Sequence, residues 1–434
     1  MKTESTPLVS RKNLLAFTMI TSLFALWGFA NAVTDPMVTA FKKVLELDNF
    51  QASLVQMAFY GGYFTMALPA SIFIRKYSYK VGVIIGLALY ASGALLFYPA
   101  AVTEQFGFFL VGLYILTFGL AFLETTANPY ILSMGDRSNA TQRLNLAQAF
   151  NPVGLIGGLL VAQHFVLKKL QSDDVDYSTL TESAKETIRT ADLMVIRDPY
   201  VVLGLVVIAV LVLIVITKMP AAKEHDLVHS TFDLIKILVG KRRYNLGVLA
   251  QVCYVGAQIM CWTYIYQYAE AFDISATTAG NYQFAAFILF FAGRFLFTFV
   301  LKYVDSGMLL MLLSILSIVF TLGVIATSGE LGLYLLVGVS FSMSLMFPTI
   351  YGLALDGLTE DESKIGAAGL VMAIVGGALM PALQGMIMDI GGSGYTDVLI
   401  LGVPEVSFSF ILPLLCFFAV AGYGWFVFEK RSQL

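Results

Sequence analysis

The chain has 434 residues, of which 58% are hydrophobic and only 13% are charged, and its formal net charge is −3. A soluble globular domain is typically about 45–50% apolar and about 25% charged, so the composition excludes an ordinary soluble protein. Apolar runs of about 20 residues, each long enough to cross the hydrocarbon core of a bilayer, recur along the whole sequence. The chain is therefore predicted to be an all-α polytopic membrane protein.

Twelve transmembrane helices are predicted. The start of the first span resembles a signal peptide, but the apolar run continues past Asp35, which favours a retained span. Residues 168–198, between spans 5 and 6, are mixed in charge and are predicted to form an external loop. In chain order the predicted spans are 13–41, 52–75, 81–101, 106–133, 146–167, 199–219, 245–270, 280–301, 308–327, 330–353, 364–389 and 408–428.

The distribution of Lys and Arg predicts the orientation in the membrane. An even number of spans puts both termini on one side, and most basic residues near span ends fall on that side. The positive-inside rule then predicts that both termini are cytoplasmic in a bacterial inner membrane, although Lys42 and Lys43 disagree. The supporting basic residues are Arg75, Lys76, Lys80, Arg137, Arg143, Lys241, Arg242, Arg243, Lys430 and Arg431.

The two halves of the chain are weakly repeated at a single ungapped offset. This repeat predicts the major facilitator architecture of two six-helix bundles, with a substrate site between them at mid-membrane. The predicted bundles are 1–219 and 245–434, joined by a linker at 220–244 whose amphipathic part is predicted to lie on the inner membrane surface. The matched pairs are Gly28 and Gly247, Gly61 and Gly280, Tyr63 and Tyr282, Arg75 and Arg294, Gly119 and Gly338, and Pro129 and Pro348, together with the Gly157–Gly158 and Gly376–Gly377 pairs.

Several polar residues of the first half have no counterpart in the second. At the same offset Glu124 falls on Met343, Asp35 on Tyr254 and Asn151 on Leu370. None of these three residues has the carboxyl or amide group of its counterpart. Residues that support the scaffold occur at matching positions in both halves. The absence of such a match for these polar residues indicates a role other than packing.

Helical spacing groups these polar residues on three predicted spans. Two pairs are four residues apart, Asn31 with Asp35 and Glu124 with Asn128, and Gln148 is three residues from Asn151, so each pair shares a helix face. Spans 1, 4 and 5 are therefore expected to present polar faces to one cavity.

Glu124 is the strongest functional candidate among these residues. Its predicted span contains no Lys or Arg to pair with it, so the carboxyl group must be protonated or hydrated for much of its time. An intramembrane acid that changes its protonation state is what proton coupling requires. Structural alternatives remain for the others. Asp35, just before Pro36, is suited to cap a break in span 1, and Gln148 and Asn151 are suited to hydrogen-bond neighbouring helices.

The second half offers fewer polar groups to a ligand. Gln258, Asn281 and Gln283 are the candidates for binding hydroxyl groups. Trp262, in "CWTYIYQYAE", has two interpretations: an aromatic ring that stacks on the C–H face of a sugar, or part of an interfacial aromatic belt with the neighbouring tyrosines.

Other classes of site find little support. Cys253, Cys261 and Cys416 lie in apolar segments, and no pair of them has the spacing of a metal or redox motif. No nucleotide-binding P-loop motif occurs, and no cofactor, metal site or nucleic-acid partner is predicted. A membrane-bound enzyme or sugar sensor is disfavoured because the sequence has neither a catalytic constellation nor an appended soluble domain.

Five segments together resemble the fucose–proton symporter family of the major facilitator superfamily. They are "FALWGFANAVTD", "FQASLVQMAFYGGYF", "FLETTANPY", "RLNLAQAFNP" and "AQVCYVGAQIMCWTY". The resemblance implies a transporter that imports a monosaccharide, most nearly L-fucose, together with a proton. It also implies that Asp35 and Glu124 act in proton coupling and sugar binding, and that Gln148 and Asn151 line the sugar cavity. The chain is expected to be a monomer in the lipid bilayer.

The chain departs from the family pattern at two places. A paired Asn-Asn of the family is replaced here by Asn31-Ala32, and a Gln-Tyr pair before "PT" is replaced by Met346-Phe347. The branches that transport glucose and galactose or amino sugars tend to vary at the acid of the "LET" motif, which this chain keeps as Glu124. The retained acid favours the fucose branch. Because of the two departures, a glucose/galactose or amino-sugar transporter of the same fold, including a sodium-coupled one, remains an alternative.

Overall fold

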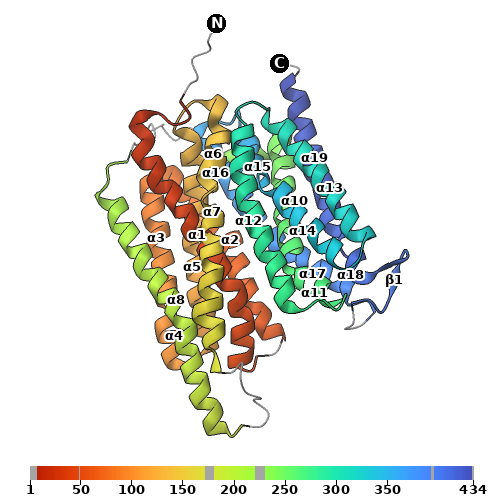
Figure 1. Cartoon of the computed structure of the whole chain (residues 1–434). Helices are drawn as coiled ribbons and strands as arrows, with labels where there is room; N and C mark the ends of the chain where they lie inside the picture. The colour runs from red at the N-terminus through yellow and green to blue at the C-terminus, as the bar shows by residue number, and fades with distance from the viewer. Residues whose placement is uncertain (1–6, 48, 172–179, 220–229, 392–394, 433–434) are drawn as a thin grey trace. The chain divides into compact units, whose positions relative to one another are not determined.

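The computed structural model describes residues 7–47, 49–171, 180–219, 230–391 and 395–432. For some helical residues, among them 35–40, it describes the path of the helix but not the side chain. Nearly all of this described chain is helical (Figure 1). Within it, twelve helical segments are long and apolar enough to cross a membrane, which confirms the predicted fold class.

The chain forms two compact units. The N-unit consists of Arg11–Tyr130 and Phe150–Leu227, and the C-unit of Met1–Ser10, Ile131–Ala149 and Val228–Leu434. This division differs from the predicted halves because two segments from the first half of the sequence, Met1–Ser10 and Ile131–Ala149, group with the second half.

The N-unit contains helices α1 to α5, α7 and α8, except for the last residues of α5, which belong to the C-unit. Helices α1 and α7 pack closely together, as do α3 and α8. The bounds are α1 (Leu14–Val44), α2 (Asn49–Lys76), α3 (Tyr79–Leu95), α4 (Phe97–Thr103), α5 (Phe106–Ser133), α7 (Asn151–Val161) and α8 (Glu182–Ile216).

The C-unit repeats this packing. Its first span, α10, lies against α17, and α13 lies against α19, as α1 and α3 do with α7 and α8 in the N-unit. The helices are α6 (Ala140–Gln148), α9 (Thr231–Gly240), α10 (Arg242–Thr263), α11 (Ile265–Glu270), α12 (Ala276–Val300), α13 (Ser306–Ala326), α14 (Glu330–Met343), α15 (Met346–Leu355), α16 (Glu360–Met372), α17 (Gly376–Met388), α18 (Glu405–Phe408) and α19 (Ile411–Ser432). An antiparallel strand pair, β1 (Leu399–Ile400) and β2 (Val403–Pro404), precedes α18.

Several spans are broken along their length, and proline explains the break in two of them. Proline has no N–H for the carbonyl group four residues earlier, and its ring collides with that carbonyl. Pro152, in the first turn of α7, therefore leaves the carbonyl of Gln148 at the end of α6 without its usual helical donor. Pro348 has the same relation to Ser344, which lies between α14 and α15.

Helix α8 begins at Glu182, well before the predicted start of span 6 at residue 199, so part of the predicted loop 168–198 is helical. Thr181 caps the helix, since its side chain accepts a hydrogen bond from the backbone N–H of Ala184. The 35 residues of α8 correspond to about 50 Å at 1.5 Å per residue, which exceeds the hydrocarbon thickness. The charged residues of α8 lie in its N-terminal part, and the apolar run follows them.

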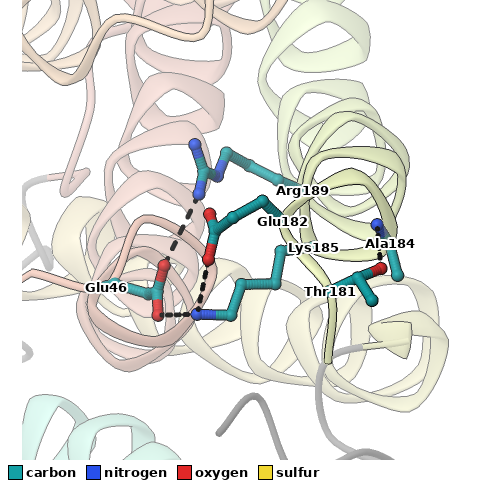
Figure 2. Close-up of polar contacts among 6 residues, drawn as sticks. All are labelled: Glu46, Thr181, Glu182, Ala184, Lys185 and Arg189. Carbon is teal, nitrogen blue, oxygen red and sulfur yellow. Dashed lines mark hydrogen bonds and ion pairs between the residues drawn. The ribbon is translucent and has the colours of Figure 1, made fainter. Parts of the chain in front are cut away.

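Ion pairs attach this extension to the turn after α1 (Figure 2). One oxygen of Glu46 lies 3.1 Å from Nζ of Lys185, and the other lies 3.5 Å from Nη2 of Arg189. Glu182 adds a contact of 3.5 Å to Lys185. Exposed ion pairs of this kind contribute about 0–1 kcal/mol each, so they orient the end of α1 more than they stabilise the fold.

Arg143 of α6 ties together the connection between predicted spans 4 and 5. The side chain is 0% exposed. Its Nε donates to the carbonyl oxygen of Ile131 at 2.8 Å, and Nη1 donates to those of Leu8 at 3.0 Å and Asp136 at 3.2 Å. Nη2 donates to the carbonyl oxygen of Leu132. A cation at the carbonyl end of a helix is favourable, and here it closes the last turn of α5.

The Arg143→Gln variant is expected to lose roughly 2–3 kcal/mol of stability, because hydrogen bonds from a charged donor disappear and buried carbonyl groups stay unpaired. Thermal unfolding of the purified protein in detergent measures this loss. Arg137 is exposed, so Arg137→Gln is the matched control and should stay within about 0.5 kcal/mol of the parent. Equal stability of the two variants would contradict the assigned role of Arg143.

Candidate functional site

Glu124 lies on α5 in the N-unit, and its carboxyl group is incompletely paired. The side chain is half-buried, and its Oε2 atom is buried without a hydrogen-bond partner in the described part of the chain. Asn128, one turn later, interacts with the carboxyl group, and the buried hydroxyl of Tyr63 on α2 is close enough to be affected by its charge. A carboxyl oxygen of this kind is free to take up a proton or to accept a hydrogen bond from a ligand.

The surroundings of Glu124 on α5 are buried and polar. Thr125, Thr126 and Asn128 are all 0% exposed. Within the described residues, no Lys or Arg lies within 4.0 Å of the Glu124 carboxylate. A carboxylate in such a place has no counter-charge of its own and depends on protonation or on water.

Glycines bring α1 and α7 into backbone contact and so place Asn31 and Asn151 on adjoining helices. A Cβ atom on Gly28 would lie 2.0 Å from the carbonyl oxygen of Asn151, and one on Gly154 would lie 1.8 Å from that of Ala25. Any larger side chain at either position would force the two helices apart. Small residues allow this approach in membrane helices, where close packing replaces the hydrophobic effect.

The amide of Asn151 also has a structural contact. Its Nδ2 donates to the backbone carbonyl of Phe24 on α1 at 3.2 Å, which is the helix-to-helix bond expected as an alternative role. Trp27 is 1% exposed, and its ring is tilted by 53° against that of Phe24 at 4.5 Å between centroids. Its indole N–H is buried without a partner in the described chain. Asn31 follows Trp27 by one turn and is partly exposed.

The side chain of Asp35 lies outside the described part of the chain. The path of α1 is described, and it runs as one helix from Leu14 to Val44. The described backbone therefore contains no break at residue 35 for Asp35 to cap. This finding removes the structural alternative proposed for Asp35 and leaves its part in proton coupling as a prediction.

In the C-unit, the polar candidates on α10 form a stripe at helical spacing. Gln251, Tyr254, Gln258 and Trp262 follow one another at intervals of three or four residues, so they share one face. Gln251 and Tyr254 are both 0% exposed, and their polar side-chain atoms are buried with no hydrogen-bond partner in the described chain. Gln258 is partly exposed.

Trp262 is buried in the C-unit, so it is not part of an interfacial belt. Its side chain is 8% exposed, and its Nε1 donates to the hydroxyl of Ser340 at 3.1 Å. Phe287 and Phe290 both approach it edge-on, at centroid distances of 4.8 and 5.1 Å. Little of the ring is exposed, and its part in ligand binding stays a prediction.

The other predicted residues of the C-unit differ in exposure and in hydrogen bonding. Asn281 of α12 is exposed, and Gln283 donates from Nε2 to the backbone carbonyl of Trp262 at 3.3 Å. Gln148, at the end of α6, is 5% exposed. The predicted site residues therefore divide into Asn31, Glu124 and Asn151 in the N-unit and Gln148, Gln258, Trp262 and Asn281 in the C-unit.

Sequence reasoning missed three buried polar residues of the C-unit: Gln251, Tyr254 and Arg294. Arg294 matches Arg75 at the repeat offset, and such a match suggested a scaffold residue. Tyr254 is the residue that Asp35 falls on at the same offset, so it carries no repeat signal of its own. The available signal was the spacing of Gln251, Tyr254 and Gln258 along one helix, which places three polar groups on the same face.

Two sets of comparisons connect this arrangement to known proteins. The sequence profile of the Major Facilitator Superfamily matches residues 15–381. The L-fucose-proton symporter of Haemophilus influenzae is 54% identical over 424 residues, which cover 96% of this chain and 97% of that protein. The chain belongs to the major facilitator superfamily and, within it, to the fucose–proton symporter family.

Other relatives agree with this assignment. The L-fucose-proton symporter of Escherichia coli is 36% identical and covers 98% of this chain and 94% of its own length. A crystal structure of the major facilitator superfamily transporter FucP in the outward conformation superposes with a TM-score of 0.84 at 34% identity, covering 96% of this chain and 99% of that one. These relatives are named as transporters and not as enzymes. A glucose/galactose transporter of Brucella abortus is 30% identical over 96% of this chain and 95% of its own.

Proposed function

We propose that this chain is a symporter that imports L-fucose, or a close chemical relative, together with protons, by alternating access between its two halves. One observation carries the proposal: 54% identity along almost the full length of a protein named as an L-fucose-proton symporter. The incompletely paired carboxyl group of Glu124 supports the coupling to protons, because an intramembrane acid without a counter-charge is suited to exchange one.

The residues are assigned the following roles. Glu124 exchanges a proton and accepts a hydrogen bond from a sugar hydroxyl, and Asp35 assists the coupling. Side-chain amides of the first half orient the sugar, and the second half adds amides and an aromatic ring. The orienting residues are Asn31, Gln148, Asn151, Gln258 and Asn281, with Trp262 as the ring.

The cellular setting belongs to the same proposal. The chain is a monomer in the bacterial inner membrane, with both termini in the cytoplasm according to the positive-inside rule. Its functional halves are 1–219 and 245–434, joined by 220–244. Of that linker, residues 220–229 lie outside the described part of the chain, and α9 follows them.

A glucose or galactose transporter of the same fold is the second candidate. It is favoured by the 30% identity to the glucose/galactose transporter of B. abortus and by the apolar residues at Ala32 and at Met346-Phe347, where the fucose–proton symporter family is expected to be polar. Sodium coupling would go with that candidate.

Uptake of a panel of labelled sugars into membrane vesicles tests both candidates, with external pH and sodium varied separately. The expected result is that L-fucose is accumulated best, that an inward proton gradient drives the accumulation, and that sodium is not needed. Accumulation of glucose or galactose in preference to L-fucose, or a requirement for sodium, would overturn the proposal in favour of the second candidate.

A further inference from the structure

Arg294 is a buried cation that the predicted mechanism does not use. It lies on α12 and is 3% exposed. Among the residues that the structure describes, no carboxylate lies within 4.0 Å of its guanidinium group. Its Nε is buried without a partner there, and its Cζ lies 4.8 Å from the ring centroid of Phe290. Charged groups inside a membrane protein are costly and usually functional.

The guanidinium group binds the carbonyl end of α6. Its Nη1 donates to the backbone carbonyl of Gln148 at 3.3 Å. Pro152 deprives this carbonyl of its helical donor, and the carbonyl end of any helix carries a partial negative charge. Arg294 therefore supplies a charged donor at the point where predicted span 5 breaks.

Two more hydrogen bonds hold α6 to other helices of the C-unit. Nε2 of Gln142 donates to the backbone carbonyl of Thr298 on α12 at 3.2 Å, and Nδ2 of Asn145 donates to Oγ1 of Thr349 on α15 at 3.0 Å. None of these contacts is an ion pair between opposite charges. Each bond of this kind has a small net free energy, so the whole contact can be made and broken.

Arg294 also has a second polar neighbour inside the C-unit. The hydroxyl of Tyr254 on α10 is electrostatically coupled to the guanidinium group and is buried with no hydrogen-bond partner in the described chain. Gln251 lies one helical turn before Tyr254. Both polar atoms of its side chain are also buried with no hydrogen-bond partner in the described chain. A second polar group within electrostatic range of a buried cation lowers the cost of releasing its first partner.

We propose that Arg294 is a positioning residue of the transport cycle. It holds the end of α6 against α12, keeps the pathway shut on the side of the membrane predicted to be cytoplasmic, and releases α6 when that side opens. Gln148, whose carbonyl it binds, is moved with α6. This inference rests on the proposed function only through alternating access, and it does not depend on which sugar is carried.

Accessibility of a buried cysteine tests the proposal without any sugar. Thr349 is 0% exposed beneath α6, so Thr349→Cys, in a background without Cys253, Cys261 and Cys416, reports opening through its rate of alkylation by a maleimide. Arg294→Gln should raise that rate roughly fivefold or more, because the shorter neutral side chain does not reach Gln148. Arg294→Lys keeps the charge and should give a rate between those of Arg294→Gln and the parent.

Arg242 provides the matched control. It is exposed, and its Cζ lies 5.3 Å from the ring centroid of Phe426, so Arg242→Gln removes a similar cation–aromatic contact outside α6. This variant should be alkylated at the parent rate. Alkylation of the Arg294→Gln variant at the parent rate would overturn the proposal. If that variant does not insert, alkylation of Arg294→Lys at the parent rate would do the same.

The outcome separates this inference from the proposed function. A parent that transports L-fucose with protons, together with an unchanged alkylation rate in both Arg294 variants, would refute the role of Arg294 alone. A raised rate in a parent background that does not transport L-fucose would support the role of Arg294 and refute the proposed substrate.

Discussion

Replacing Glu124 with Gln is expected to abolish uphill accumulation of L-fucose, so that the internal concentration no longer exceeds the external one. Gln keeps the size of the side chain and most of its hydrogen bonding, but it has no exchangeable proton in this range of pH. Sugar exchange across the membrane is expected to survive, because exchange requires no net release of a proton. This separation of exchange from accumulation is the signature of a lost coupling group.

The structure argues that the variant folds. Oε2 of Glu124 is buried without a partner in the described chain, and a neutral amide costs less to bury than a carboxylate. Asn128 is one turn away and remains a neighbour for the amide. The Glu124→Gln protein should therefore insert and purify like the parent.

Accumulation and counterflow of labelled L-fucose measure the two activities in the same vesicles. Glu182 offers the same chemical change elsewhere, since its side chain is 88% exposed and pairs only with Lys185 in the described contacts, so Glu182→Gln should transport like the parent. Full uphill accumulation by the Glu124→Gln variant would show that another group carries the proton.

A disulfide between α6 and α15 is expected to stop transport completely and reversibly. A Cβ atom on Gly352 would lie 3.3 Å from Cβ of Thr141, which is close to the range of about 3.5–4.5 Å found in disulfides. Both positions belong to the C-unit. If α6 must leave α15 in each cycle, a covalent bond between the two helices blocks both accumulation and counterflow.

The experiment joins Thr141→Cys and Gly352→Cys in a background without the three native cysteines. Oxidation should abolish uptake, and dithiothreitol should restore it to the level of the reduced protein. Each single variant is a control that cannot form this bond and should not respond to the oxidant. Undiminished uptake by protein shown to be crosslinked would mean that α6 and α15 stay together throughout the cycle.

The fold was largely predictable because the hydropathy of the sequence and the spacing of its apolar runs determine the number and positions of the membrane spans. Apolar runs marked the twelve spans, and the lack of a charge partner for Glu124 within its own span was visible directly in the sequence. The contact of Glu124 with Asn128 agrees with their spacing of four residues on one helix. The structure adds the burial of Oε2 and the proximity of Tyr63, neither of which follows from spacing along one helix.

The differences from the sequence-based expectations have identifiable causes. Helix α8 begins earlier than the predicted span 6 because its N-terminal part is charged. A hydropathy pattern detects only the apolar part of such a helix. The packing of Ile131–Ala149 with the second half was not predictable, because it depends on contacts between residues distant in sequence, such as Asn145 with Thr349. Arg294 was overlooked because repetition at one offset was taken to indicate a scaffold role.

The most direct test of the central claim is the pH of a weakly buffered suspension of de-energised cells that express this chain. Addition of L-fucose should make the medium more alkaline, because each sugar that enters brings protons with it, and the change should not require sodium. The Glu124→Gln variant should give no change. Sugar-dependent uptake of sodium with a constant pH would contradict proton-coupled transport of L-fucose.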